Sequence, residues 1–232
     1  MTRRAATSTP PLQCGVECEA EAWALGAQYV AGVDEVGRGA LFGPVVAAAV
    51  ILDPSTPLTG LNDSKQLTAA QRETLDAAIR SQALAWAVAA VDAAVIDAVN
   101  IYQATRRAMR QAVLALSPAP DYLLIDAMRL DWDGPQQSLI KGDARSISIA
   151  AASIVAKVYR DRLMQVWDPV FPGYRLGANK GYSTADHLAA LARYGPTPLH
   201  RCSFAPISGM AVMARPAAPP ADASAPCLPF PQ

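Results

Sequence analysis

Two apolar segments separated by a glycine-rich turn constrain the fold of this chain more than any other feature. Residues 29–34 (YVAGVD) and 44–52 (PVVAAAVIL) have the length and apolar content of buried strands. The sequence between them contains VGRGALFG, and its glycines allow the chain to reverse direction within a few residues. We therefore predict that the two strands form a hairpin within a sheet.

The rest of the chain alternates apolar segments with amphipathic ones. Further strands are predicted at residues 83–91 and 122–126, with a candidate fifth strand at 137–140. Helical spacing predicts helices over residues 68–80, 101–116, 146–166 and 185–194. This order predicts an α/β fold, with a mixed β-sheet flanked by helices and a helical C-terminal part.

Composition changes near both ends of the chain. Residues 1–27 form a mixed, proline-containing lead, and residues 209–232 are rich in Pro and Ala, with almost no charge. We predict an N-terminal tail over 1–27, a single folded domain over 28–208 and a C-terminal tail over 209–232.

Charge and hydropathy exclude several classes of protein. The formal net charge is zero, so affinity for nucleic acid would have to come from a local basic surface. Every apolar run is interrupted before the roughly 18 residues that a membrane span requires, and the N-terminus lacks the apolar core of a signal peptide. We expect a monomeric cytoplasmic protein that makes no membrane contact, with its four cysteines reduced and without structural zinc.

Acidic residues follow two of the apolar strands. Asp34 and Glu35 end the first strand, Asp126 ends the 122–126 strand, and Asp143 lies in the loop IKGD. Each acid taken alone could equally cap a strand or a helix. Adjacent Asp34 and Glu35 would project to opposite sides of a regular strand, so both serve one site only if the chain bends there or the site lies at the strand edge.

Clustered carboxylates repel one another and persist when cations neutralise them. Hard oxygen ligands favour Mg²⁺ or Mn²⁺. Two such ions about 4 Å apart can hydrolyse a phosphodiester without a protein nucleophile. The chain has only two histidines and no nucleophile elbow, so this chemistry fits better than a catalytic triad. We interpret His187 and His200 as packed or hydrogen-bonding residues.

The basic residues are strongly biased toward arginine, with 16 Arg and 4 Lys. The four lysines, each beside small, polar or acidic residues, are Lys65, Lys141, Lys157 and Lys180. A compact ammonium in such a position can meet a phosphate as a point charge, although an ordinary solvated lysine is the alternative for each. Asp161 is interpreted as a salt-bridge partner of Arg160 or Arg162.

Gly37-Arg38-Gly39 offers backbone N–H groups that a ligand can approach closely. It is not a dinucleotide fingerprint, because Phe42 occupies the position of the third glycine and a strand follows where a helix would be needed.

The segment AGVDEVGRGALFGPVVAAAVIL (31–52) resembles the N-terminal signature of bacterial ribonuclease HII. Further similar segments follow in the same order: LNDSKQL (61–67), LLIDAM (123–128), IKGDARSISIAAASIVAKVYRDRLM (140–164), NKGYSTADH (179–187) and HRCSF (200–204). The resemblance covers roughly residues 28–208 and implies a ribonuclease H-like fold.

The same resemblance implies an endonuclease that cuts the RNA strand of RNA/DNA hybrids and also cuts at ribonucleotides embedded in duplex DNA. It implies Mg²⁺ or Mn²⁺ as cofactor and products with 3′-hydroxyl and 5′-phosphate ends. The implied metal ligands are Asp34, Glu35, Asp126 and Asp143. The implied readers of the ribose 2′-hydroxyl are Gly37, Arg38, Gly39 and Tyr182. The implied phosphate contacts are Lys65, Lys141, Ser146, Ser153, Lys157 and Lys180.

Three positions, in two segments, depart from the family pattern. Ala40 and Phe42 replace the usual Pro and Ala, so a bulky ring is expected beside the 2′-hydroxyl reader. Gln66 replaces a second lysine, which removes one charge near the expected path of the nucleic acid backbone.

Three other functions compete with this interpretation. Ribonuclease HIII normally carries an additional N-terminal domain, for which 27 residues are too few, and a Glu as its last acid. An inactive nucleic-acid-binding relative would gain nothing from keeping four acids near phosphates. A hydrolase of small phosphoesters would differ in being insensitive to salt.

Overall fold

The computed structural model describes residues 14–210, and they form one five-stranded sheet covered by helices. The strands are β1 (Val30–Val36), β2 (Val45–Ile51), β3 (Ala85–Val91), β4 (Tyr122–Asp126) and β5 (Gln136–Leu139). The α-helices are α1 (Glu17–Ala24), α2 (Ala69–Gln82), α3 (Ala93–Val99), α4 (Ile101–Leu114), α5 (Ile147–Trp167), α6 (Leu176–Asn179) and α7 (Ala185–Tyr194). The 3₁₀ turns are η1 (Ser64–Gln66), η2 (Gly142–Ala144) and η3 (Ile207–Gly209).

The sheet is mixed, as predicted, with the strand order β3-β2-β1-β4-β5. β1 and β2 form the predicted antiparallel hairpin, and β3 continues it on the far side of β2. β4 pairs in parallel with β1, and β5 pairs in parallel with β4. β1 is therefore the strand at which the antiparallel and parallel halves of the sheet meet.

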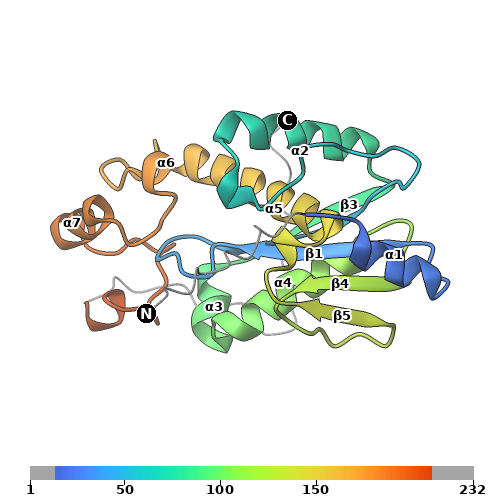
Figure 1. The fold of residues 1–232 in the computed structure, drawn as a ribbon. Helices are drawn as coiled ribbons and strands as arrows, with labels where there is room; N and C mark the ends of the chain where they lie inside the picture. The colour runs from blue at the N-terminus through green and yellow to red at the C-terminus, as the bar shows by residue number, and fades with distance from the viewer. Residues whose placement is uncertain (1–13, 211–232) are drawn as a thin grey trace, which may run out of the picture.

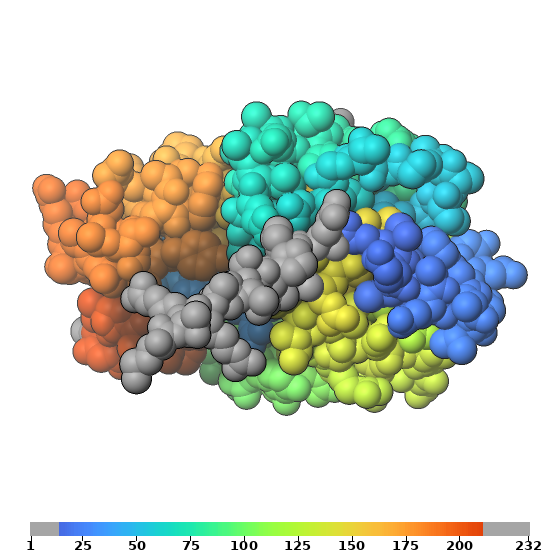
Figure 2. Space-filling model, viewed as in Figure 1, coloured from blue at the N-terminus to red at the C-terminus, as the bar shows by residue number. Residues whose placement is uncertain are grey.

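Helices cover both faces of the sheet (Figure 1). α5 packs along β1 and β2 on one face with α2 outside it, while α3 and α4 lie on the other face. β2 is buried along its whole length, and its three consecutive alanines leave room for a helix on each side. Figure 2 shows the α2 segment lying between the C-terminal helices and α1 on one face of the molecule.

The predicted helix starts have identifiable caps. Thr68 and Gln71 form a reciprocal capping box at the start of α2, in which the Thr68 hydroxyl accepts from the Gln71 amide. Thr184 caps α7 in a similar way through the His187 amide. These caps explain why the two helices begin within a residue of the expected positions.

The segment expected to be an N-terminal tail contains a packed helix. α1 places Cys18 and Ala22 against Val30 and Leu124 in a small apolar cluster, so the described part of residues 1–27 belongs to the folded unit. The helix is hard to recognise in the sequence because three glutamates alternate with its first apolar residues. Residues 1–13 and 211–232, and with them nearly all of the expected C-terminal tail, lie outside the described residues.

Two further observations bear on the sequence-based expectations. Cys14 and Cys18 are free thiols in the described part of the chain, whereas Cys227 lies outside it. Within residues 14–210, no helix combines the length and apolar content that crossing a membrane would require.

The close contact between β1 and α5 depends on Gly32. A Cβ atom at this position would lie 2.0 Å from the Ser148 carbonyl carbon and 2.4 Å from the Ile149 nitrogen. Both are backbone atoms, so neither can rotate away. This glycine lets α5 lie directly against the strand that carries Asp34 and Glu35.

We predict that Gly32→Ala lowers the free energy of unfolding by about 3 kcal/mol, with a Tm lower by roughly 10 °C, because the backbone of α5 has to move. Urea denaturation and thermal melting measure the change. Gly209→Ala is the matched control, since nothing lies within 4 Å of its added Cβ. Equal stability of the two variants would contradict the packing described here.

Candidate active site

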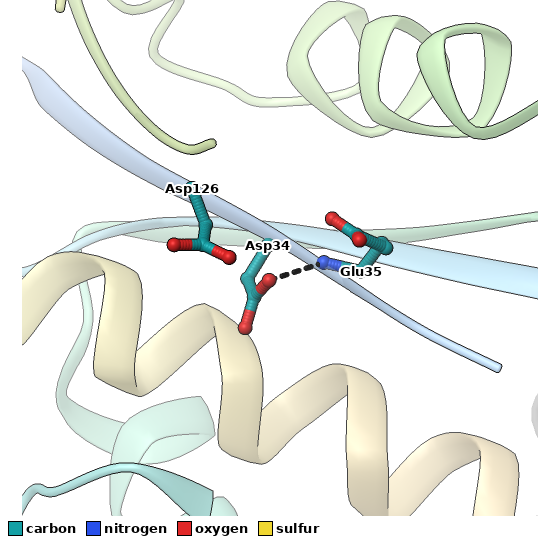
Figure 3. A group of neighbouring side chains, drawn as sticks. All are labelled: Asp34, Glu35 and Asp126. Carbon is teal, nitrogen blue, oxygen red and sulfur yellow. Dashed lines mark hydrogen bonds between the residues drawn. The ribbon is translucent and has the colours of Figure 1, made fainter. Parts of the chain in front are cut away.

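The three central acids lie at the carboxyl edge of the sheet. Asp34 and Glu35 are near the end of β1, and Asp126 is the last residue of β4. The parallel register pairs Val33 with Ile125, so the residues that follow, Asp34 and Asp126, are neighbours. One carboxylate oxygen from each of the three acids lies within 4.8 Å of the others (Figure 3). The structure thus brings three of the four predicted acids together.

β1 does not bend at the acids. It stays paired with β2 through Val36, so Asp34 and Glu35 leave opposite sides of the strand. Figure 3 shows Asp34 directed toward α5 and Glu35 directed away from it. Because β4 ends at Asp126, the three carboxylates converge at the edge of the sheet, which is the second of the two arrangements that the sequence left open.

Burial and mutual repulsion raise the pKa values of these carboxyl groups. Asp34 is 5% exposed, and burial followed by the charges of Glu35 and Asp126 raises its pKa well above the usual value. Burial also raises the pKa of Glu35, against the opposing effect of Arg38. Burial is likewise the main cause of the raised pKa of Asp126, opposed by the Gly142 amide, which donates to its Oδ1 at 2.7 Å.

The acidic group has unused capacity to bind a cation. Glu35 Oε2 is buried and has no hydrogen-bond partner among residues 14–210, although Oε1 accepts from Arg38 at 3.2 Å. An unpartnered buried carboxylate oxygen is costly unless a donor or a cation reaches it. Three carboxylates supply only hard oxygen donors, the type that Mg²⁺ and Mn²⁺ prefer. The residues therefore fit a divalent cation.

Asp143 lies at the rim of this group. It belongs to η2 and is 5% exposed, and its Oδ2 accepts from Lys65 Nζ at 3.0 Å. Its charge contributes to the raised pKa values of Asp34 and Asp126, although no oxygen of Asp143 falls within the three-residue group. The structure therefore brings the four acids that the sequence singled out into one region. Asp143 lies outside the three-residue group.

The glycine-rich turn follows the acids directly and is folded back against Tyr182. Gly37 has φ +89°, and a Cβ there would lie 2.2 Å from Arg160 Nε, so the position requires glycine. The amides of Leu41 and Phe42 donate to the Gly181 carbonyl at 2.8 and 3.3 Å. The segment after Gly39 is therefore hydrogen-bonded to the residue before Tyr182, and Arg160 lies against both Gly37 and the Tyr182 ring.

Phe42 does not lie beside this surface as the sequence suggested. Its side chain is fully buried and packs edge-to-face against Trp167, Phe171 and His200. The glycine after it, at φ +78°, turns the chain so that the ring enters the core. The larger side chain is thus accommodated inside the protein, and the backbone of Phe42 is what contacts Gly181.

The four lysines occupy different surroundings. Lys65 pairs with Asp143, and Lys157 donates to Asp161 at 2.7 Å. Lys180 is partly buried, which lowers its pKa, and Lys141 is exposed. Asp161 pairs with Lys157 and, at 3.8 Å, with Arg72, so the expected pairing with Arg160 or Arg162 is wrong.

The two serines expected to contact phosphate have structural roles. Ser146 is fully buried as the N-cap of α5, and its hydroxyl donates to Glu19 at 2.5 Å and accepts from the Ile149 amide. The hydroxyl of Ser153, 5% exposed, shares a hydrogen bond of 2.7 Å with Ser64. In this structure neither hydroxyl faces solvent, because each is used to fix a neighbouring segment.

Sequence reasoning missed two buried guanidinium groups behind the glycine-rich turn. Arg160 donates to the carbonyls of Phe42, Pro44 and Lys180, and its guanidinium carbon lies 5.4 Å from the centre of the Tyr182 ring. Arg201 donates to the carbonyls of Arg38 and Gly43, and burial lowers its pKa to about 9. Both side chains are fully buried without an ion pair to an acid of residues 14–210.

The position of Arg160 in the sequence offered one signal. It follows Ser153 and Ala156 at helical spacing, which places Arg160 on the buried side of α5. A long donor inside the core must hydrogen-bond to carbonyls that secondary structure leaves free, and a glycine-rich turn between two strands has such carbonyls.

Comparison with known proteins shows which family shares this sequence. A family model described as ribonuclease HII matches residues 31–207, which is well over half of the chain. The chain belongs to the ribonuclease HII family. It is 60% identical over 195 residues to a ribonuclease HII of Solibacter usitatus, covering 84% of this chain and 86% of that protein. It is 58% identical over 192 residues to a ribonuclease HII of Enterococcus faecalis, covering 83% and 75%.

Solved structures agree with this assignment. The crystal structure of ribonuclease H2 from Pyrococcus horikoshii has a TM-score of 0.67 and 25% identity, covering 78% of this chain and 96% of that one. Bst-RNase HIII in complex with Mn²⁺ has a TM-score of 0.60 and 22% identity, covering 89% and 74%, and shares the fold. The predicted ribonuclease H-like fold and endonuclease function of the ribonuclease HII type are confirmed.

The raised carboxyl pKa values predict an unusual effect of pH on stability. The folded metal-free protein binds more protons than the unfolded chain in the range between the unfolded and folded pKa values of these acids. Its free energy of unfolding therefore falls as the pH rises through that range. We predict that Asp34→Asn removes much of this dependence and stabilises the metal-free protein at neutral pH by on the order of 1–3 kcal/mol.

Thermal melting in EDTA between about pH 4 and pH 8 measures this effect. Added Mn²⁺ should raise the Tm of the unaltered chain and have a much smaller effect on Asp34→Asn. Asp133→Asn is the control, since that side chain is exposed and accepts no hydrogen bond from residues 14–210. A metal-free Asp34→Asn protein less stable than the unaltered chain would contradict the repulsion described here.

Proposed function

We propose that this chain cuts the RNA strand of RNA/DNA hybrids and cuts duplex DNA on the 5′ side of a single embedded ribonucleotide. The products would carry 3′-hydroxyl and 5′-phosphate ends. The observation that carries the proposal is the convergence of Asp34, Glu35 and Asp126 within 4.8 Å, directly before the glycine-rich turn. Hydrolytic chemistry and recognition of a ribose would then occupy adjacent positions on one strand and its following loop.

We propose Mg²⁺ or Mn²⁺ as the cofactor. Asp34, Glu35 and Asp126 would hold the ions, with Asp143 completing the ligand set from the rim. When bound, two such ions lower the pKa of an attacking water and neutralise charge on the leaving oxygen. The orphaned Glu35 oxygen and the raised carboxyl pKa values support this assignment. The Mn²⁺ in the structure of Bst-RNase HIII is a precedent within the same fold.

Two backbone amides and one side chain hold the three acids in place. The Gly142 amide fixes one oxygen of Asp126, and Arg38 fixes one oxygen of Glu35. The Glu35 amide donates to Asp34 Oδ1 at 2.7 Å, which leaves the other oxygen of Asp34 available. Fixed carboxylates need little reorganisation when substrate binds, and this lowers the barrier to hydrolysis.

We further propose that the backbone of Gly37, Arg38 and Gly39 hydrogen-bonds to the ribose 2′-hydroxyl, with Tyr182 stacked on the adjacent sugar or base. The 2′-hydroxyl is the group that distinguishes RNA from DNA. Lys65, Lys141, Lys157 and Lys180 would contact phosphates, and Arg72, brought beside Lys157 by Asp161, is an additional candidate. We propose that the chain acts as a monomer in the cytoplasm.

Asp126→Asn tests the hydrolytic part of this proposal. The variant should lose cleavage by at least about 1,000-fold, because a metal ligand is lost, while binding to a ribonucleotide-containing duplex stays within about threefold. Denaturing gels measure cleavage, and fluorescence anisotropy measures binding. Asp121→Asn is the matched control, since that aspartate accepts from the Gln28 and Tyr29 amides at the far end of β1. Mg²⁺-dependent cutting by Asp126→Asn at the normal rate would contradict the role of Asp126 as a metal ligand.

A pair of glycine variants tests the recognition part. Gly37→Ala should reduce cleavage at a single ribonucleotide about 100-fold and also lower stability, because its Cβ collides with Arg160 and its φ is positive. The Cβ that Gly39→Ala adds meets open space in the free protein, so this variant should fold normally. It should lose activity only because the added methyl group obstructs the ribose. Full activity of a normally folded Gly39→Ala would show that the ribose binds elsewhere.

A further inference from the structure

Two fully buried histidines lie behind Tyr182. His187 is in α7, and its Nδ1 lies 2.9 Å from the Tyr182 carbonyl oxygen. Its Nε2 lies 3.0 Å from Nε2 of His200. His200 Nδ1 in turn lies 2.9 Å from the Thr197 amide nitrogen. The two rings therefore connect two backbone groups, one at each end of a short chain of hydrogen bonds.

The two backbone groups determine where the protons are. The Thr197 amide can only donate, so His200 Nδ1 accepts, and a neutral His200 carries its proton on Nε2. That proton is donated to Nε2 of His187, which leaves the His187 proton on Nδ1. The Tyr182 carbonyl can only accept, and it receives this proton. Both ends of the chain thus require the same pair of neutral tautomers.

The pair also reaches the glycine-rich turn. His200 forms an isolated antiparallel bridge with Phe42, and their rings pack edge-to-face with centres 4.9 Å apart. The Arg201 amide donates to the Leu41 carbonyl at 2.8 Å. One histidine is therefore attached to the segment after Gly39, and the other holds the backbone of Tyr182. Their mutual hydrogen bond links the two halves of the proposed ribose-recognition surface.

We propose that His187 and His200 are positioning residues, which hold Tyr182 in register with the Gly37–Gly39 backbone through a directed chain of neutral hydrogen bonds. This proposal rests on the proposed role of that surface in recognising the ribose. Neither ring is exposed, so each acts through the backbone it holds. A shift of the Tyr182 segment would weaken discrimination between ribonucleotide and deoxyribonucleotide more than it would weaken general binding to the duplex.

A third proton on the pair would break this chain. It would place two N–H groups against each other between the rings, or an Nδ1–H of His200 against the Thr197 amide, where the Thr197 hydroxyl at 2.9 Å would be the acceptor in place of the present donor. Burial, the largest effect, lowers the pKa of His187, so its ring stays neutral at neutral pH. The charged and titratable groups on the surrounding elements are Arg160, Arg175, Arg193, Arg201, Lys180, Tyr174, Tyr194, Asp97 and Asp186. Asp186 pairs with Arg175, and Asp97 accepts from the Ser203 hydroxyl.

Two substitutions at His187 separate positioning from packing. Both His187→Leu and His187→Asn remove the imidazole ring, but Asn keeps an N–H near the position of Nδ1 that can donate to the Tyr182 carbonyl. The experiment uses the full chain in the cleavage-deficient Asp126→Asn background with Mg²⁺. Fluorescence anisotropy gives the ratio of affinities for a duplex with one ribonucleotide and the same duplex in all-DNA form. Thermal melting of each variant reports folding.

We expect His187→Leu to lower the affinity ratio about tenfold, because the Tyr182 carbonyl loses its donor and His200 loses its acceptor, and His187→Asn to lower it only about threefold, because only the link to His200 is lost. Equal losses in both variants, or a ratio unchanged in a folded His187→Leu, would overturn the proposal. A background without any preference for the ribonucleotide would contradict the recognition surface itself, and the proposal with it.

The pH dependence of the same ratio, without any change at His187, covers the case in which the leucine variant does not fold. Because burial lowers the pKa of His187, the ratio should stay constant near neutral pH and fall several-fold between about pH 6 and about pH 4.5 as the pair takes up a proton. Changes in the metal-binding acids affect both duplexes and cancel in the ratio. A ratio that stays constant over this range would overturn the proposal.

Discussion

The parallel pairing of β1 with β4 is the constraint on which the site depends. It places the residues after Val33 and Ile125 side by side, so the carboxylates of Asp34 and Asp126 lie next to each other. α5 then covers Asp34, made possible by Gly32, and burial prevents water from screening the repulsion. The fold therefore contains an electrostatic conflict that binding of a divalent cation would relieve.

The surroundings of the acids divide this conflict between fixed and movable groups. The Gly142 and Glu35 amides are backbone donors and cannot leave. Arg38 and Lys65 are long, exposed side chains that partly neutralise Glu35 and Asp143. Long cationic side chains on carboxylates can exchange partners when a cation or a phosphate arrives, whereas backbone amides keep the ligand geometry. With this division the protein can be stable without a metal ion and keep its ligand geometry when one binds.

The positive groups behind the glycine-rich turn have a different function. Arg160 and Arg201 are buried where no substrate atom could reach them, and they bind the carbonyls of the turn. These bonds fix carbonyls of the turn from inside, while the amides of Leu41 and Phe42 donate to the Gly181 carbonyl. The price is two desolvated charges in a low-dielectric region, offset by hydrogen bonds to backbone carbonyls and by contact with aromatic rings.

Much of this architecture could be predicted from local sequence. Apolar segments ending in acids identified β1 and β4, and the glycines after Asp34 identified the turn, because both signals arise from adjacent residues. Burial of polar side chains could not be predicted in the same way. Ser146 looked available for a phosphate until α1, whose glutamates resemble a solvated tail, proved to bring Glu19 against it. The ring of Phe42 likewise turned inward because partners distant in the sequence surround it.

The alternatives that the sequence left open differ in what they allow at this edge of the sheet. An inactive relative has no reason to keep three carboxylates in mutual repulsion. A hydrolase of small esters has no need for a turn held in place by two buried arginines. The ribonuclease HII family accounts for both features, because its members must hydrolyse a phosphodiester and recognise the sugar beside it.

Cleavage of a labelled DNA duplex containing one ribonucleotide tests the central claim most directly. The reaction is followed on a denaturing gel with Mg²⁺, Mn²⁺ or EDTA, beside the same duplex without the ribonucleotide. The account predicts metal-dependent cutting on the 5′ side of the ribonucleotide, no cutting in EDTA and an intact all-DNA control. Cutting of both duplexes alike, or cutting that persists in EDTA, would contradict the account of adjacent metal-binding and ribose-recognition sites.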